Sequence, residues 1–176
     1  AYFYREAGSS RWQPLSRAEI DSQSSDGFEP YAVDSGMNAA LGFDNDARGF
    51  KTLYAVSLDG NLTRTELLSA ENADVDSLVT IGRRQRVIGA SYATEKRTVK
   101  YFDTELRDLA TALGNALPGQ PTISFVGASE DERELLLITG SDVDPGMLYK
   151  FDRDTNQLNP LLPIRETTEG RTLAEM

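Results

Sequence analysis

The chain has 176 residues, 39% of them hydrophobic, with a mean hydropathy of -0.42 and a formal net charge of -10. No apolar run approaches the ~20 residues of a membrane-spanning helix, and the acidic balance argues against nucleic acid, whose phosphates need a basic face. The chain contains no His and no Cys, so it lacks the commonest general base, the commonest zinc ligands and any disulfide. We therefore expect a soluble chain that binds no nucleic acid, membrane, metal or cofactor. Its compartment, cytoplasmic or periplasmic, stays open.

Residues 1–15 predict the end of a β-sheet unit. Residues 1–6 (AYFYRE) alternate between apolar and polar side chains, a Gly/Ser turn follows, and residues 11–15 (RWQPL) pair back. Because the chain begins inside a strand and stops without a terminating feature, we expect it to be a fragment of a longer protein. Residues 16–27 are polar and rich in Ser and Asp, which predicts a connecting loop.

Residues 28–69 predict a four-stranded antiparallel meander. The runs FEPYAV, AALGFD, LYAVSL and TRTELL favour strands, and polar turns separate them. The last reversal contains Asp59 and Gly60, a pair that readily supplies the positive φ of a hairpin turn.

Residues 77–117 predict a second unit, in which a helix follows the third strand. The runs LVTIG, VIGASYA and VKYFD favour strands. After them the apolar residues take helical spacing, with Asp103 or Thr104 as the N-cap and Pro118-Gly119 as the stop. We expect this short amphipathic helix, near 104–117, to pack on the sheets rather than to bind a partner. Its apolar stripe consists of Leu106, Leu109, Ala110, Leu113 and Leu117.

Residues 122–162 predict a third unit, built from the runs TISFVGAS, ELLLIT, LYKFD and LNPLL. Residues 164–176 lose the alternation and are expected to form an exit linker toward a missing C-terminal domain. The third strands of the units align at Ala1, Leu53, Val99 and Leu148, with separations of 52, 46 and 49 residues. A period of 40 to 50 residues with four strands per unit is typical of β-propeller blades. We therefore predict an all-β chain whose residues 1–163 form about three four-stranded antiparallel blades and a partial one.

Three segments carry a resemblance to a known family. Residues 141–146 (SDVDPG), followed by LYKFD and by the closing strand at 158–162, resemble a blade of the N-terminal propeller of the prolyl oligopeptidase family. The helix near 104–117 and the ending RTLAEM are also similar to its bacterial acylaminoacyl-peptidase-like or dipeptidyl-aminopeptidase-like branch. The resemblance runs from about Phe28 on and rests on blades and turns, not on catalytic motifs.

The resemblance implies a function for the parent protein. In that family a propeller precedes an α/β-hydrolase domain with a Ser-Asp-His triad, so this chain would stop just before that domain. The propeller would cap the active site and admit short peptides, which would bind through the missing C-terminal domain. No catalytic residue can be assigned to this chain by the resemblance.

Arg83, Arg84 and Arg86 form the one basic cluster of an acidic chain. They are candidates for holding a substrate carboxylate in the propeller channel, because guanidinium groups bind carboxylates in two-pronged geometry. The simpler interpretation, which we favour, is a solvated turn.

Other motifs give no catalytic or metal site. Ser91 lies in GASYA, which lacks the closing glycine of a nucleophile elbow, and the chain has no His to serve as its base, so we expect a plain strand. Calcium loops starting at Asp44 or Asp142 would lack the required Glu, so these residues, with Asp46 and Asp144, are expected in turns. Asn61 begins a glycosylation triplet inside a predicted tight hairpin.

Two functions stay open, and a third is weak. The first is the propeller portion of a serine peptidase that hydrolyses short peptides, with no catalytic residues in this chain. The second is a stand-alone propeller that binds a partner or acts as a scaffold. An independent enzyme is disfavoured because the chain offers no base, metal set or phosphate loop.

Overall fold

A computed structural model of the chain consists mostly of antiparallel β-strands, which confirms the all-β prediction. Among the described residues α1 is the single α-helix. The chain divides into two compact units, residues 1–78 with 90–99 and residues 79–89 with 100–176. The described residues are 1–6, 8–20, 25–95, 97–141 and 144–165, so most of the predicted exit linker lies outside them.

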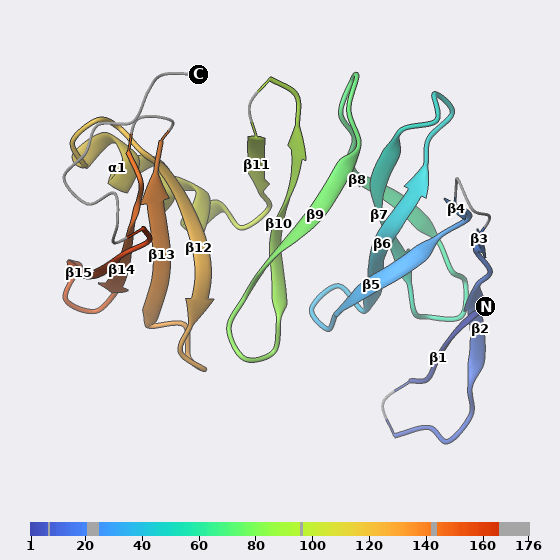
Figure 1. Cartoon of the computed structure of the whole chain (residues 1–176). Coiled ribbons are helices and arrows are strands. Elements are labelled where there is room, and N and C mark those ends of the chain that lie inside the picture. The colour runs from blue at the N-terminus through green and yellow to red at the C-terminus, as the bar shows by residue number, and fades with distance from the viewer. Residues whose placement is uncertain (7, 21–24, 96, 142–143, 166–176) are drawn as a thin grey trace. The chain divides into compact units, whose positions relative to one another are not determined.

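The first meander is a four-stranded sheet in chain order within the first unit (Figure 1). Each strand pairs with the next, and the predicted turn at Asp59 and Gly60 separates the last two. Gly60 has a φ of 88°, a value that glycine adopts without a Cβ clash. The strands are β5 (Glu29–Asp34), β6 (Ala39–Asn45), β7 (Lys51–Ser57) and β8 (Arg64–Leu68).

Two short hairpins precede this meander. The predicted N-terminal pair is present as β1 (Tyr2–Tyr4) and β2 (Gln13–Ser16). The loop predicted over residues 16–27 is only partly a loop, because β3 (Glu19–Ile20) and β4 (Ser25–Asp26) pair within it. Two-residue strands leave no alternation that a sequence pattern could reveal.

The middle sheet has three strands, β9 (Val75–Ile81), β10 (Arg86–Ala93) and β11 (Arg97–Tyr101). The prediction of about three four-stranded blades is therefore wrong for this unit, which has three strands instead of four. The predicted helix follows as α1 (Thr104–Ala116), and the side chain of Asp103 caps it by accepting the N–H of Leu106 at 3.1 Å.

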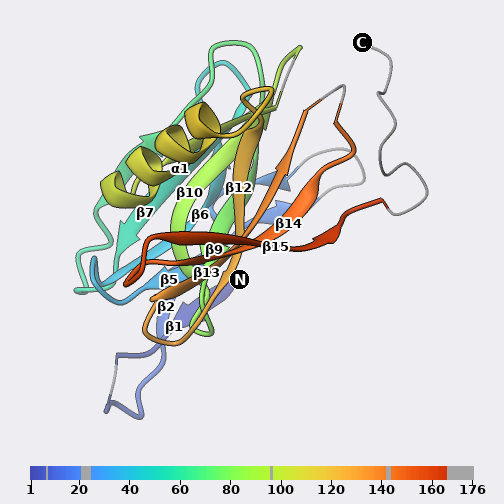
Figure 2. The same cartoon turned by 90° about the vertical axis from the view of Figure 1, so that its left-hand side faces the viewer.

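The second meander is a four-stranded sheet in the second unit, and α1 lies against its first strand (Figure 2). In its first two strands buried side chains alternate with more exposed ones, as a sheet with two different faces requires. The strands are β12 (Thr122–Ala128), β13 (Glu134–Gly140), β14 (Met147–Asp152) and β15 (Gln157–Pro163).

The two meanders share one strand register at an offset of 95 residues. Gly42 pairs with Tyr54 in the first, and their counterparts Leu137 and Tyr149 pair in the second. The bulge between the first two strands recurs as well, at Pro30/Ala32 and at Phe125/Gly127. Bulges disrupt the ladder at a fixed place, so their recurrence indicates a structural repeat.

A second bulge, between the third and fourth strands, recurs three times. It lies at Leu53/Tyr54 in the first meander and at Leu148/Tyr149 in the second. The β1–β2 pair carries the same bulge at Tyr2/Phe3, so these strands correspond to the last two strands of a repeat. The structure also corrects the predicted alignment of the repeats by one residue. Tyr2, not Ala1, corresponds to Leu53, because each of the two stands immediately before the shared bulge.

Each meander has two distinct faces. We define the leading face of a sheet as the face that packs on elements earlier in the chain. The trailing face is the opposite face of the same sheet. In the first meander the leading face packs on Tyr4 and Leu15 of the β1–β2 pair. In the second, the leading face packs on Ile81, Ile88 and Leu106 from the middle sheet and α1. The leading-face core residues are Phe28, Ala40 and Val56 in the first meander, and Ile123, Phe125, Leu135, Leu137 and Phe151 in the second.

Candidate functional site

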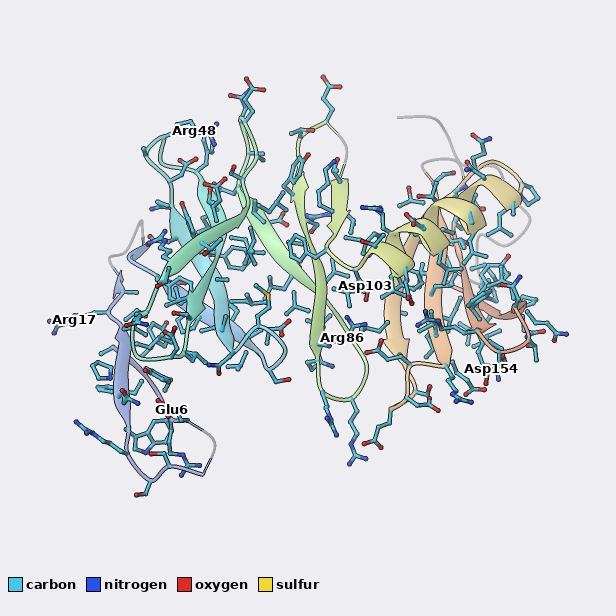
Figure 3. The ribbon with its side chains drawn as sticks, turned by 180° about the vertical axis from the view of Figure 1, so that it is seen from behind. Glu6, Arg17, Arg48, Arg86, Asp103 and Asp154 are labelled. Carbon is cyan, nitrogen blue, oxygen red and sulfur yellow. The ribbon has the colours of Figure 1, made fainter. Side chains whose placement is uncertain are left out.

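The Arg-rich segment lies at the β9–β10 reversal, where Arg83 and Arg84 are exposed in the turn and Arg86 is the first residue of β10. The guanidinium of Arg86 donates to both carboxylate oxygens of Glu132, at 2.8 and 2.5 Å. It also donates to Asp103 at 2.9 Å, and Arg86 and Asp103 are both labelled in Figure 3. The other carboxylate oxygen of Asp103 caps α1. Arg86 therefore links the start of β10, the β12–β13 turn and the helix N-terminus.

The electrostatics of this cluster follow from its hydrogen bonds. The guanidinium of Arg86 lowers the pKa of Glu132, and Glu132 in turn raises the pKa of Arg86. Burial alone would raise the pKa of Asp103, but the N–H of Leu106 and the guanidinium of Arg86 outweigh it and lower that pKa. Two carboxylates of the chain therefore already bind Arg86, while Arg83 and Arg84 are exposed in the turn.

A stability prediction follows from these lowered pKa values. A carboxylate whose pKa is lower in the folded chain stabilises it above the unfolded pKa, and that contribution is lost as the pH falls through the folded pKa. We expect Glu132→Gln to cost about 0.5 to 1 kcal/mol at pH 7, a value reduced by solvent screening. The cost should shrink toward zero below about pH 4.

Urea unfolding at pH 7 and at low pH measures this difference. Glu130→Gln, an exposed neighbour in the same turn, is the matched control and should cost little at either pH. An equal loss in the Glu132→Gln variant at both pH values would contradict the assigned role of the ion pair.

Ser91 lies inside β10, as the sequence predicted, and not at a strand-to-helix turn. Its side chain is buried, its hydroxyl donates to Asp76 at 3.3 Å, and Arg97 donates to that hydroxyl at 2.8 Å. The guanidinium of Arg97 lowers the pKa of Asp76, which makes this carboxylate a weak base. The cluster thus joins the three strands of the middle sheet and does not resemble an activated nucleophile.

Asp44 was expected in a turn but lies within strand β6, whereas Asp46 follows that strand and Asp144 precedes β14, both outside strands. Asp44 accepts the N–H of Gly27 and the guanidinium of Arg64, and Asp144 accepts the N–H of Gly146. Asp142 lies outside the described residues. Within the described part of the chain no three His, Cys, Asp or Glu residues are placed to share a metal ion. Asn61 is exposed in its turn, where its backbone N–H donates to Asp59.

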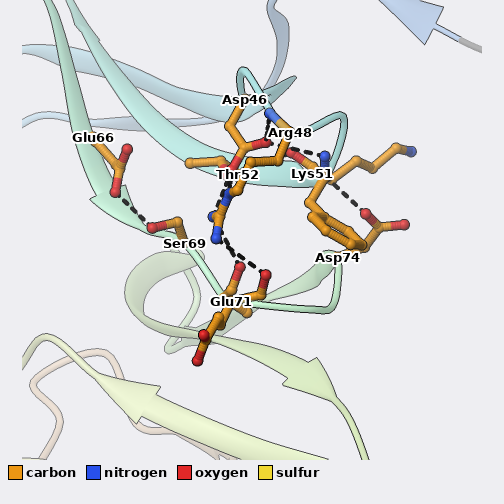
Figure 4. A network of polar contacts seen from close by, with 10 residues as sticks. Asp46, Arg48, Lys51, Thr52, Glu66, Ser69, Glu71 and Asp74 are labelled. Carbon is orange, nitrogen blue, oxygen red and sulfur yellow. Dashed lines mark hydrogen bonds and ion pairs between the residues drawn. The ribbon is translucent and has the colours of Figure 1, made fainter.

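A second cluster, around Arg48, escaped the sequence analysis. Its guanidinium donates to Asp46 at 2.6 Å and to the carbonyl oxygens of Ala70 and Glu71 at 3.0 Å (Figure 4). Asp46 also accepts the backbone N–H groups of Arg48 and Phe50. The cluster fastens the β6–β7 loop to the segment that follows β8. Its partners are mostly backbone carbonyls, which carry no sequence signal.

Comparisons with protein-family models, with curated protein sequences and with solved structures gave no match. Within the described residues, no helix has the length and hydrophobicity needed to cross a membrane.

Proposed function

We propose that this chain is part of the β-propeller of a serine peptidase of the prolyl oligopeptidase family. In the parent protein it would cap the active site and admit short peptides, while an α/β-hydrolase domain outside this chain would carry the triad. The chain itself would supply no catalytic residue.

One observation carries this proposal: the shared register of the two meanders. Two four-stranded sheets whose pairings and bulges recur at a constant offset, with one sheet between them in the chain, are what alternate blades of a propeller require. The packing of each meander's leading face on an earlier sheet agrees with it, because blades stack face to face. The peptidase part rests on the resemblance of residues 141–162 and of the helix to that family.

The chemistry of the described residues agrees with a gating role rather than a catalytic one. The polar clusters around Arg86, Arg97 and Arg48 are satisfied by groups of the chain itself. Ser91 is buried and its acidic neighbour has a lowered pKa.

A fluorophosphonate probe, which labels active serine hydrolases, tests the proposal on a soluble extract of the source organism. Proteins are then captured under denaturing conditions with an antibody raised against this chain, so that only covalently linked label is counted. We expect label on a polypeptide far heavier than 19.4 kDa that yields peptides of this chain. The isolated chain and a heat-treated extract are the controls, and both should stay unlabelled.

Peptides of this chain found only in unlabelled bands, while other serine hydrolases of the extract label well, would overturn the peptidase assignment. A stand-alone propeller that binds a partner or acts as a scaffold would then be the better assignment.

A further inference from the structure

The trailing face of the first meander shows how this repeat is covered. Its central cross-strand row is Phe43, Leu53 and Leu68. Phe43 and Leu53 pack on Val75 and Ala90 of the middle sheet, and Leu68 packs beside them. A trailing face of this repeat is therefore built to receive the next β-sheet.

The trailing face of the second meander has the same row but no cover among the described residues. The residues corresponding to Phe43, Leu53 and Leu68 are Ile138, Leu148 and Leu162. Leu162 is 49% exposed. In the neighbouring row Leu136 is 36% exposed, whereas its counterpart Leu41 in the first meander is 1% exposed.

Two of the charged groups on this face, Glu134 and Lys150, lie beside the apolar rows and are paired with each other, while Asp152 accepts backbone N–H groups of the turn that follows it. Lys150 is the cross-strand neighbour of Leu136, and its ammonium group donates to Glu134 at 2.8 Å. A partner that covers only the row of Ile138, Leu148 and Leu162 leaves this ion pair at its side. Binding such a partner therefore adds little cost for removing water from the charged groups. The face is thus apolar where a second sheet would pack.

The leading face of the β1–β2 pair also carries an exposed apolar residue, at a position that is packed in the two meanders. The shared bulge places Phe3 in the position of Tyr54 and Tyr149. Those two tyrosines pack against leading-face cores, whereas Phe3 is 58% exposed. An open apolar pocket of about 460 Å³ lies beside Phe3 and Pro14, and it extends to Leu15 and Leu62 on the side that meets the first meander.

We propose that the trailing face of the second meander binds the leading face of the β1–β2 pair in a second copy of this chain. The repeat itself supports this choice of occupant, because each covered trailing face in the chain meets the leading face of a later sheet. The contact joins two different surfaces, so it links copies head to tail. This inference concerns the chain by itself and does not depend on peptidase activity; in the parent protein of the proposed function, the same two faces would pack on further blades of one polypeptide.

Sedimentation velocity of the purified chain, from about 1 to about 300 µM, tests the proposal over the range where modest interfaces associate. We expect the sedimentation coefficient to rise with concentration. One variant, Leu136→Lys with Leu162→Lys, blocks the trailing face, and another, Phe3→Lys, blocks the leading face. Each variant alone should remain monomeric. Met37→Lys, which changes an exposed apolar residue of the β5–β6 turn, is the matched control and should associate like the unaltered chain.

Mixing the two blocked variants distinguishes head-to-tail contact from symmetric contact. Each variant keeps one intact face, so an equimolar mixture should form 1:1 dimers and no larger species. Association of Phe3→Lys alone would overturn the proposal in favour of a symmetric dimer through the trailing face. A monomeric unaltered chain at every concentration would also overturn it, and would assign both faces to further sheets of the same polypeptide.

The absence of cysteine provides a second readout that does not require charged substitutions. The Leu162→Cys variant carries a single thiol in the covered row, and its rate of reaction with a maleimide should fall about tenfold between the lowest and highest concentrations. The thiol of a Met37→Cys variant should react at a constant rate. A constant rate in both variants overturns the proposal even if the lysine variants fail to fold.

Discussion

Replacing Gly42 by Ala should destabilise the first unit by at least about 3 kcal/mol, which is a large part of the stability of a small domain. Gly42 lies in β6 opposite the bulge of β5, where the two backbones approach closely. A Cβ at this position would collide with the carbonyl group of Glu29 and lie 2.8 Å from the Cα of Pro30. These are backbone atoms of a paired strand, so the sheet itself would have to shift.

Chemical denaturation followed by tryptophan fluorescence and circular dichroism would measure this loss, and Trp12 is the single tryptophan of the chain. Gly127→Ala is the matched control, because its Cβ would meet only side-chain atoms of Leu136, at ordinary distances of 3.5 Å or more. We expect that control to change the stability by less than about 1 kcal/mol. Similar midpoints for Gly42→Ala and Gly127→Ala would show that β5 can move away from β6 without loss.

Replacing Leu135 by Ala should cost about 3 kcal/mol, within the range measured for buried leucines. Leu135 is fully buried on the leading face of the second meander, in a cluster with Ile81, Ile88 and Phe125. Truncation removes three carbon atoms from this cluster and leaves a cavity that neighbours on paired strands cannot readily fill.

The adjacent residue supplies the control for this prediction. Leu136→Ala makes the same chemical change on the opposite face and should cost less than about 1 kcal/mol. Both variants should be unfolded in urea at low micromolar concentration, where self-association does not contribute. Equal losses at positions 135 and 136 would contradict the assignment of the two faces.

The sequence predicted the strands well where the side chains themselves carry the pattern. Residues 135–139 are a short apolar run rich in strand-forming residues, and the turn at Asp59 and Gly60 has the residue types that its backbone needs, so both were correctly predicted. The helix was found because Asp103 supplies a cap and apolar residues follow at helical spacing. Local rules sufficed because each of these signals lies within a few residues.

Features that depend on distant partners could not be predicted in the same way. Arg86 was interpreted as part of a basic turn, but Glu132, which binds it, lies 46 residues later in the chain. No pattern of a single sequence joins two such positions. The bulges likewise arise from the pairing of two strands, and they corrected the predicted alignment at Ala1 by one residue. The exposure of the second meander's trailing face likewise could not be predicted. It is recognised by comparison with the first meander, whose trailing face is covered by the middle sheet.

The strand order has a consequence for the time course of folding. Every pairing within the two meanders joins strands that are neighbours in sequence, connected by reversals of a few residues. Short loops close quickly and at little entropic cost, so each meander can form its hairpins before distant segments meet. Packing between successive sheets would come later and limit the rate. We expect amide protons of the inner strands β6, β7, β13 and β14, which are paired on both sides, to gain protection first during refolding.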